Sequence, residues 1–424
     1  MVVGIRSDVA RGFSRSGRRV TPDRGAPIGH HESHSGLVRR LTLTPSTAEE
    51  SPALDAIVVP AARRACNLEH AITMARAARC HLVILCSMDA HPAEVLDLLA
   101  ARSFSAATVV EIKPEYEHEF FEFETTEWIK REFPARVSDL SIKRNVGLAL
   151  ARLLNWRRIF FMDDDIRDLD ATALRATVSL VSGESPKQRY YSAGMSSIEF
   201  PDNSVVCHAR REIKEPQDVF VSGSALAVNC TESFGFFPDI YNEDWLFFYR
   251  DAAEGRLGTS GHTATQLCYD PFADPRRAEN QEFGDVIAEG LYALLEGGWG
   301  AEHATAESWK QFLADRRQML DEIINRSPEV RDDIREKMLY AVEIARKTLK
   351  RIKPEMCADY VECWRGDLVR WETRLKDLKQ VPKMTSIDDA LDWLGLAAER
   401  MEAPKTSMPS GHRHAGSCQC DARS

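Results

Sequence analysis

Short apolar runs alternate with segments of helical periodicity along the middle of the chain. The predicted strands are rich in β-branched and aromatic residues and cover 56–60, 81–87, 107–112 and 158–162. The predicted helices cover 68–78, 92–102 and 139–155. Short strands that alternate with helices are typical of a mostly parallel sheet flanked by helices. The pattern therefore predicts an α/β fold with a Rossmann-like sheet.

Changes of composition divide the chain into four regions. Residues 1–52 are rich in Arg, Ser, Gly, Pro and His and show no sustained apolar period, which predicts disorder. The α/β pattern predicts one domain over 53–300, in which the acidic and aromatic segment 115–137 is interpreted as a helix lying over the sheet. Helical spacing of apolar residues predicts an α-helical domain over 301–400. Residues 401–424 are expected to form a flexible tail.

The predicted C-terminal helices carry an apolar stripe that includes Trp364 and Trp371. Such a stripe is typical of core packing, and a homodimer through these helices is also open. The tail segment GHRHAGSCQC, residues 411–420, has His and Cys spacings that match no structural zinc site well.

The overall composition restricts the classes of function. A net charge of −10 disfavours a nucleic-acid partner. Ten cysteines without a repeated CxxC spacing indicate reduced thiols in a cytoplasmic protein. No apolar run is long enough for a membrane span, and the N-terminus lacks the apolar core of a signal peptide.

The strand that ends at Met162 runs directly into Asp163, Asp164 and Asp165. Like charges repel, and each costs free energy to desolvate unless a cation or hydrogen bonds compensate. One interpretation is a solvated loop or a helix cap. The other is an active site, because such sites lie at the carboxyl ends of parallel strands. The first and third carboxylates would then face the same way and suit Mg²⁺ or Mn²⁺.

Several segments around these aspartates follow one another in a characteristic order. They read IVVPAARRACNLEHAI, LVILCSMDA, SIKRNVGLALARLLNWRRIFFMDDD, FVSGSALAVN and FPDIYNEDWLFF. Together they resemble the motifs of GT-A-fold nucleotide-sugar glycosyltransferases, most closely glycosyltransferase family 2. The resemblance covers roughly half of the chain, from Leu54 to Asp270.

The resemblance implies a nucleoside-diphosphate sugar as donor. The residues implied to bind it are Pro60, Ala61, Arg63, Asp89, Lys143, Arg144, Asn145, Asp163 and Asp164. The residues implied to hold the metal are Asp165, Asp163 and His262, although a lone histidine is also common in purely structural roles. Basic side chains near a diphosphate make sense as charge-assisted donors. By themselves, Lys143 and Arg144 fit an exposed basic helix turn equally well.

On the acceptor side, the resemblance implies that Glu243 and Asp244 are catalytic, with Asp244 as general base. An acceptor hydroxyl is a poor nucleophile until a carboxylate takes its proton. The alternative for this pair is helix capping. The residues implied to form the acceptor pocket are Ser222, Gly223, Ser224 and Trp245. The Ser-Gly-Ser segment is expected to be a turn, either functional or merely tight.

The sequence thus predicts a metal-dependent glycosyltransferase that moves a sugar to a hydroxyl acceptor, with inversion favoured and retention open. The first alternative is a nucleotidyltransferase that makes a nucleotide sugar. Such enzymes usually have a Gly-rich loop and a lysine after the first strand, and AARRACN contains neither. The second alternative is a non-catalytic protein that binds a nucleotide sugar. The sugar, the base and the acceptor stay open.

Overall fold

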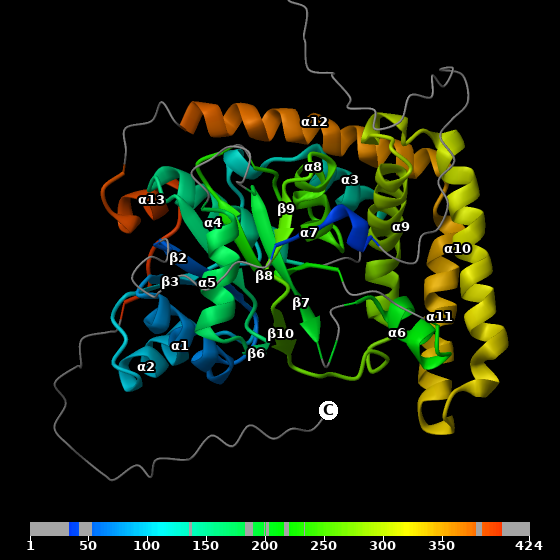
Figure 1. The fold of residues 1–424 in the computed structure, drawn as a ribbon, viewed down its shortest axis with the longest axis horizontal. Coiled ribbons are helices and arrows are strands. Elements are labelled where there is room, and N and C mark those ends of the chain that lie inside the picture. The colour runs from blue at the N-terminus through cyan, green and yellow to red at the C-terminus, as the bar shows by residue number, and fades with distance from the viewer. Residues whose placement is uncertain are drawn as a thin grey trace, which may run out of the picture.

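The computed structural model describes residues 34–41, 53–134, 138–182, 190–198, 200, 203–215, 220–232, 234–378 and 384–400. Within them, a mixed and mostly parallel sheet is flanked by helices and followed by a helical C-terminal part (Figure 1). The predicted α/β architecture is confirmed at this level. The expectations for 1–33, 42–52 and the tail 401–424 lie outside the described residues.

The main sheet runs across the molecule in an order that differs from the order of the chain. Its strands are, from edge to edge, β1 (Arg39–Arg40), β9 (Leu257–Thr259), β7 (Ser192–Ile198), β8 (Ser222–Asn229), β5 (Arg158–Met162), β2 (Ala56–Ala61), β3 (His81–Cys86) and β4 (Ala107–Glu111). Only β8 is antiparallel to its neighbours on this path. Two short strands lie off the path, β6 (Ile166–Asp168) and β10 (Thr263–Gln266).

The strand order reverses between β2 and β5. From β2 the chain moves outward to β3 and β4, and it then returns to form β5 on the other side of β2. Because β2 and β5 are parallel, with Val58 opposite Phe161, their carboxyl ends meet at one edge of the sheet. In open α/β sheets, ligands bind in the crevice at such a reversal. The topology therefore directs attention to Pro60, Ala61 and the aspartates after Met162.

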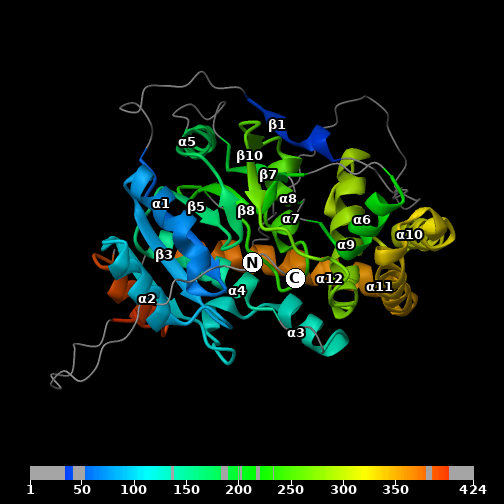
Figure 2. The same ribbon diagram turned by 90° about the horizontal axis from the view of Figure 1, so that it is seen from below.

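Helices cover both faces of the sheet because successive strand residues point to opposite sides. Figure 2 shows α5 (Ala171–Leu180) and α4 (Leu140–Leu153) on opposite sides of the strands. Ile57 and Val59 join one buried cluster with α1 (Glu69–Ala78), α2 (Pro92–Ala101) and α5, whereas Val58 joins another with α4. A Cβ on Gly147 of α4 would lie 2.9 Å from Val58 Cγ1, so α4 approaches the sheet closely.

The helical part begins earlier than the sequence indicated. Its members are α9 (Arg276–Glu296), α10 (Ala306–Arg326), α11 (Asp332–Arg351), α12 (Pro354–Leu378) and α13 (Ile387–Trp393). The expected boundary at residue 300 follows α9, yet α9 packs against α10 and α11 (Figures 1 and 2). No helix within the described residues is both long and apolar enough to cross a membrane.

The tryptophan stripe of α12 is buried within the chain. Trp371 is fully buried, and its indole donates a hydrogen bond of 3.1 Å to the carbonyl oxygen of Phe234, which lies between β8 and Glu243 in the chain. One apolar cluster includes Trp371, Trp364 and Val58 of the sheet, so the helical part and the sheet share a core. The interpretation of the stripe as core packing is confirmed, and the homodimer stays a prediction.

The described part of the segment 115–137 packs on α12, whereas we expected the segment to lie over the sheet. Its helix α3 (Glu124–Glu132) begins where Asp367 of α12 accepts hydrogen bonds from the backbone N–H groups of Glu124 and Thr125, at 3.0 and 2.8 Å. Trp128 stacks on Phe283 of α9 with ring centroids 5.0 Å apart. The short 3₁₀ helices are η1 (Ser35–Leu37), η2 (Ala65–Leu68), η3 (Glu119–Phe121), η4 (Ala301–His303) and η5 (Ser327–Glu329).

One buried acid makes the stability of the fold depend on pH. Asp251 in α8 (Tyr249–Ala253) accepts a hydrogen bond from Ser192 Oγ, and burial raises the pKa of Asp251 to about 7. The folded chain keeps a proton that the unfolded chain loses above about pH 4, so the free energy of unfolding falls as the pH rises from about 4 to about 7. Asp251→Asn stays neutral. The unmodified protein should lose up to about 4 kcal/mol of stability between about pH 4 and 7, and Asp251→Asn should not show this loss.

Chemical denaturation at several pH values between about 5 and 8 measures this difference. Asp359→Asn changes an exposed acid of α12 and should leave the pH dependence unaltered. Parallel stability curves for Asp251→Asn and the unmodified protein would contradict the prediction.

Candidate active site

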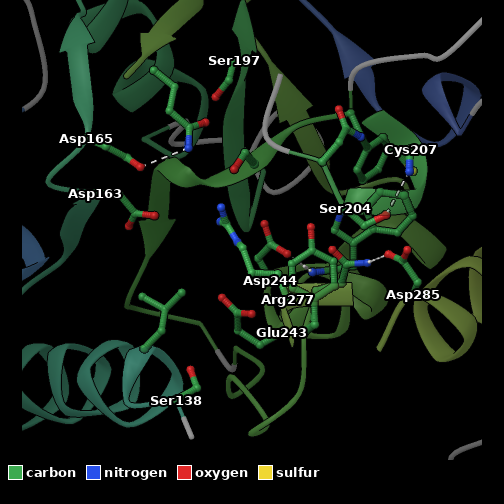
Figure 3. A pocket seen from close by; sticks show the side chains of 18 of the residues that line it. Ser138, Asp163, Asp165, Ser197, Ser204, Cys207, Glu243, Asp244, Arg277 and Asp285 are labelled. Atoms are coloured by element: carbon green, nitrogen blue, oxygen red, sulfur yellow. Dashed lines mark hydrogen bonds between the residues drawn. The ribbon is translucent and has the colours of Figure 1, made fainter. Parts of the chain in front are cut away.

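A pocket of about 330 Å³ lies at the carboxyl ends of β2 and β5 and extends to α6 (Val205–Glu212), α9 and α10. The residues predicted from sequence that line it are Pro60, Arg63, Lys143, Arg144, Asp163, Asp164, Asp165, Ser222, Glu243, Asp244 and Trp245. Figure 3 shows its two sides, with Asp163 and Asp165 on one, and Ser204, Cys207 and Asp285 on the other. The structure therefore brings most of the predicted site together.

The middle aspartate, Asp164, joins the ends of β2 and β5. Its Oδ2 accepts hydrogen bonds of 2.7 Å from the backbone N–H groups of both Ala62 and Arg63. Only 2% of its surface is exposed. Asp164 was expected to bind the nucleotide sugar, but in the structure its carboxylate shapes the loop after β2. This accounts for one of the three like charges without any ligand.

Arg63 compensates the charge of the third aspartate. Its Nη2 lies 2.8 Å from Asp165 Oδ2, and its Nη1 donates to Asp164. Gln266 of β10 also donates to Asp165 Oδ2, at 3.1 Å. Burial by itself lowers the pKa of Arg63, but the charges of Asp165 and Asp164 raise it above its ordinary value. The guanidinium therefore stays charged and occupies part of the space where a metal ion was expected.

Arg144 of α4 holds the two acidic motifs together. Its Nη2 lies 2.9 Å from both carboxylate oxygens of Asp163, and its Nη1 donates to Glu243. Burial alone would lower the pKa of Arg144, but Asp163, Glu243 and Asp244 raise it above its ordinary value. Glu243 is nearly buried. Glu243 lines the pocket, but its carboxylate is held in this ion pair.

Asp244 is half-buried and lines the pocket at the start of α7 (Glu243–Phe247). Its Oδ2 accepts from the backbone N–H of Gly223 at 2.7 Å, and its Oδ1 accepts from that of Trp245 at 2.8 Å. Two backbone donors thus fix the orientation of the carboxylate. The helix start predicted for this pair is confirmed.

The segment Ser222-Gly223-Ser224 is the beginning of β8, so its interpretation as a turn is wrong. Of its members, only Ser222 lines the pocket. A Cβ on Gly223 would lie 2.7 Å from Asp244 Cβ and 2.9 Å from Arg144 Nη1. Glycine is needed here because the strand passes close to both side chains, and not because of its backbone angles.

Lys143 and Asn145 of α4 bind backbone and side-chain groups of neighbouring segments. The Lys143 Nζ lies 2.8 Å from Ala61 O, 2.5 Å from Ser87 Oγ and 3.1 Å from Asp139 Oδ2, and burial lowers the pKa of this amine. Asn145 does not line the pocket. Its amide pairs with the backbone N–H and carbonyl of Phe237, both at 2.8 Å.

Asp89 and His262 are two further predicted residues that do not line the pocket. Asp89 is exposed, although its backbone N–H donates to Ala62 O at 3.1 Å and so borders the loop after β2. His262 is also exposed. The structure does not bring His262 to Asp165.

The described side chains offer few protein ligands for a metal ion. Among them, no group of three His, Cys, Asp or Glu residues could hold a metal ion. Both oxygens of Asp163 face the buried Arg144, whereas Asp165 pairs with the more exposed Arg63. Mg²⁺ commonly takes one or two protein carboxylates together with water and phosphate oxygens. The residues therefore fit an ion held by Asp165 and a bound phosphate, with Arg63 moved aside.

Sequence reasoning missed a wall of the pocket formed by His34. This residue belongs to the segment 1–52 expected to be disordered, yet it is buried, and the adjoining strand β1 pairs with β9. The imidazole lies 3.3 Å from Glu289 and T-stacks on Trp245 with ring centroids 5.3 Å apart. Burial lowers the pKa of His34, but contacts with Glu289 and Glu296 outweigh this and raise it above its ordinary value. A segment this short carries no periodicity that could have revealed it.

The far side of the pocket was also missed. It is formed by side chains from residues 203–210, α9, α10 and the segment after β10, among them Asn203, Ser204, Cys207, Arg210, Tyr269, Arg277, Asp285 and Arg316. Arg316 is buried and lies 2.9–3.1 Å from Glu282 and Asp285. Burial raises the pKa of Glu282 to about 7 despite the nearby Arg316. Apolar periodicity cannot indicate which polar residues of three separate helices converge.

Comparison of the chain with models of known protein families found no match, and a comparison with curated proteins found none with significant sequence similarity. The function is therefore inferred from the residues and geometry of the pocket.

We predict that Gly223→Ala displaces Asp244, because the added methyl group would overlap Asp244 Cβ and Arg144 Nη1. The free energy of unfolding should fall by about 1–3 kcal/mol, the usual cost of overpacking a buried position. Thermal and chemical denaturation measure the loss. Gly366→Ala is the matched control, since its Cβ would meet nothing within 4 Å in α12, and it should stabilise the helix by up to about 1 kcal/mol. Equal stabilities of the two variants would refute the close approach at Gly223.

Proposed function

We propose that the protein is a glycosyltransferase with a GT-A-like fold that moves a sugar from a nucleoside-diphosphate sugar to a hydroxyl group. The observation that carries the proposal is the meeting of two acidic motifs in one pocket at the strand reversal. Asp163–Asp165 and Glu243–Asp244 come from distant parts of the chain, and Arg144 joins them. Nucleotide binding at a strand reversal is common in open α/β sheets.

The donor would lie across the ends of β2 and β5. The loop after β2 would border the nucleotide, and Arg63 would contact the diphosphate, for which a guanidinium is a suitable charge-assisted donor. Asp165 would hold Mg²⁺ or Mn²⁺, which neutralises the charge that develops on the leaving diphosphate. For this, Arg63 would exchange its carboxylate partners Asp164 and Asp165 for phosphate oxygens of the donor.

Asp244 is the better candidate for the general base of the two neighbouring acids. Its carboxylate lines the pocket, and two backbone N–H groups orient it. Glu243 lines the pocket too, but its carboxylate pairs with the buried Arg144. In the proposed reaction, Asp244 takes the proton of the acceptor hydroxyl as the new glycosidic bond forms. A single base that acts on the acceptor favours inversion at the anomeric carbon.

The first test is a thermal-shift panel of UDP-, GDP-, TDP- and ADP-sugars with and without Mn²⁺. A donor present at about 100 times its dissociation constant should add about 2.7 kcal/mol to the stability. Incubation with the donor and hydroxyl acceptors should then release a nucleoside diphosphate. Release of pyrophosphate from a nucleoside triphosphate and a sugar phosphate would instead identify a nucleotidyltransferase. Absence of any nucleotide response would refute the proposal.

We predict that Asp244→Asn lowers turnover by about 10²–10⁴ and leaves donor affinity nearly unchanged. The amide keeps the size of the side chain and an acceptor for the Gly223 N–H, but it cannot take the proton. Glu243→Gln removes one charge from the Arg144 ion pairs and should mainly lower stability, by about 1–3 kcal/mol. Turnover, donor affinity and stability are measured side by side. If Glu243→Gln loses turnover while Asp244→Asn keeps it, Glu243 is the base.

We predict that Arg63 competes with the divalent ion for Asp165. Arg63→Gln removes the 2.8 Å ion pair and should tighten the binding of Mn²⁺ to the nucleotide-free protein several-fold. Asp165→Asn should abolish this binding. Electron paramagnetic resonance of free Mn²⁺ measures both effects without substrate. Arg64→Gln is the control, because Arg64 does not line the pocket. Unchanged Mn²⁺ affinity in both Arg63→Gln and Asp165→Asn would remove the metal from the proposal.

A further inference from the structure

The basic side chains that line the pocket fall into two groups. The six arginine and lysine residues are Arg63, Lys143, Arg144, Arg210, Arg277 and Arg316. Four of them have carboxylate partners at 4.0 Å or less, namely Arg63, Lys143, Arg144 and Arg316. Arg210 and Arg277 make no ion pair with any residue in the described part of the chain. The pocket thus contains positive charge that its own carboxylates do not compensate.

Arg210 shows this most clearly. It lies on α6, three residues after Cys207 and on the same face, and both side chains line the pocket. Its exposed surface is only 9%, and its side chain makes no hydrogen bond to the described residues. A cationic side chain on a residue with so little exposed surface loses part of its hydration, which is costly unless a partner compensates it. The structure therefore places an unsatisfied cation against the pocket.

Arg277 adds a second cation from the first turn of α9. Its guanidinium carbon lies 4.1 Å from the centroid of the Tyr269 ring, which orients the group but leaves its N–H donors uncommitted. The two helices are tied together where the Val205 N–H donates to Gln281 Oε1 at 2.9 Å. Arg210 and Arg277 thus approach the same pocket from helices that pack on each other.

The acids on this side of the pocket are already engaged. Asp285 accepts from Arg316 and from Asn242, both at 2.9 Å. Glu289 lies 3.3 Å from His34. Within the described residues, neither carboxylate forms an ion pair with Arg210 or Arg277. A bound anion would compensate these two cations.

We propose that Arg210 and Arg277 form an oxyanion subsite, and that the acceptor carries a phosphate or carboxylate group in addition to its reacting hydroxyl. This inference rests on the proposed function, because Asp244 would receive the proton of that hydroxyl. The donor diphosphate belongs to the other side of the pocket, with Arg63 and Asp165. Figure 3 shows Ser204 and Cys207 of α6 on the opposite side from Asp163 and Asp165. The acceptor is accordingly a small hydroxylated anion rather than a neutral alcohol.

The subsite is tested without substrate by calorimetric titration of the full chain with inorganic phosphate, acetate and glycerol at constant ionic strength. Phosphate or acetate should bind, and the tighter of the two identifies the acidic group. Glycerol should not bind. Arg210→Met and Arg277→Met should each weaken oxyanion binding about tenfold or more, as loss of a charge-assisted hydrogen bond does. Arg210→Lys should recover part of the affinity.

Arg276→Met is the matched control, since Arg276 is the exposed neighbour of Arg277 and does not line the pocket. It should bind oxyanions like the unmodified protein. Arg210→Met should melt no lower than the unmodified protein, because it removes a buried charge that has no partner. Arg277→Met changes a half-buried position and decides the question if Arg210→Met does not fold. Unchanged oxyanion affinity in the folded variants would overturn the subsite.

A nucleoside-diphosphate titration separates this inference from the proposed function. If Arg210→Met keeps nucleotide affinity and loses phosphate affinity, the subsite belongs to the acceptor. If both affinities fall tenfold, the two arginines serve the donor, and the inference about the acceptor is wrong while the glycosyltransferase proposal stands. If the unmodified chain binds phosphate through Arg210 but binds no nucleotide, the subsite stands and the glycosyltransferase proposal fails.

Discussion

The buried guanidinium of Arg144 is the constraint on which the candidate site depends. It contacts Asp163 at the end of β5 and Glu243 at the start of α7, and thereby joins the sheet to the segment before the helical part. A buried arginine with one carboxylate removed would leave an uncompensated charge, which is strongly unfavourable. The position of each acid therefore depends on the other. The same arrangement explains why position 223 is a glycine, since only a residue without a side chain fits beside Arg144 and Asp244.

This arrangement explains how a strand can end on three consecutive aspartates. Each carboxylate has a different partner: Asp163 pairs with Arg144, Asp164 binds two backbone N–H groups, and Asp165 pairs with Arg63. Two of these partners are fixed parts of the fold. Arg63 is the exception because almost half of its side chain is exposed, so it is the partner that a ligand can replace most easily.

The sequence was informative where short-range patterns determine the structure. Apart from the segment 115–137, the strands and helices between residues 56 and 162 agree with the predicted ranges within one or two residues, because β-branched runs and helical spacing are local signals. The acidic motifs could also be found, since their residues are adjacent. His34, Arg210 and Arg277 could not, because each reaches the pocket through tertiary packing. Asn145 was expected to bind the nucleotide sugar, but its amide pairs with the backbone of Phe237, a contact that carries no side-chain signal in the sequence.

The placement of His34 has a consequence for how the chain is made. A ribosome synthesises this residue long before its contacts Trp245, Glu289 and Glu296. Domains tend to fold from the N-terminus as they emerge, and contacts between distant segments form slowly. The segment that carries His34 must wait until β9 and α9 are in place. The wall of the pocket next to Trp245 therefore forms only after the strands from β2 to β8 have been synthesised.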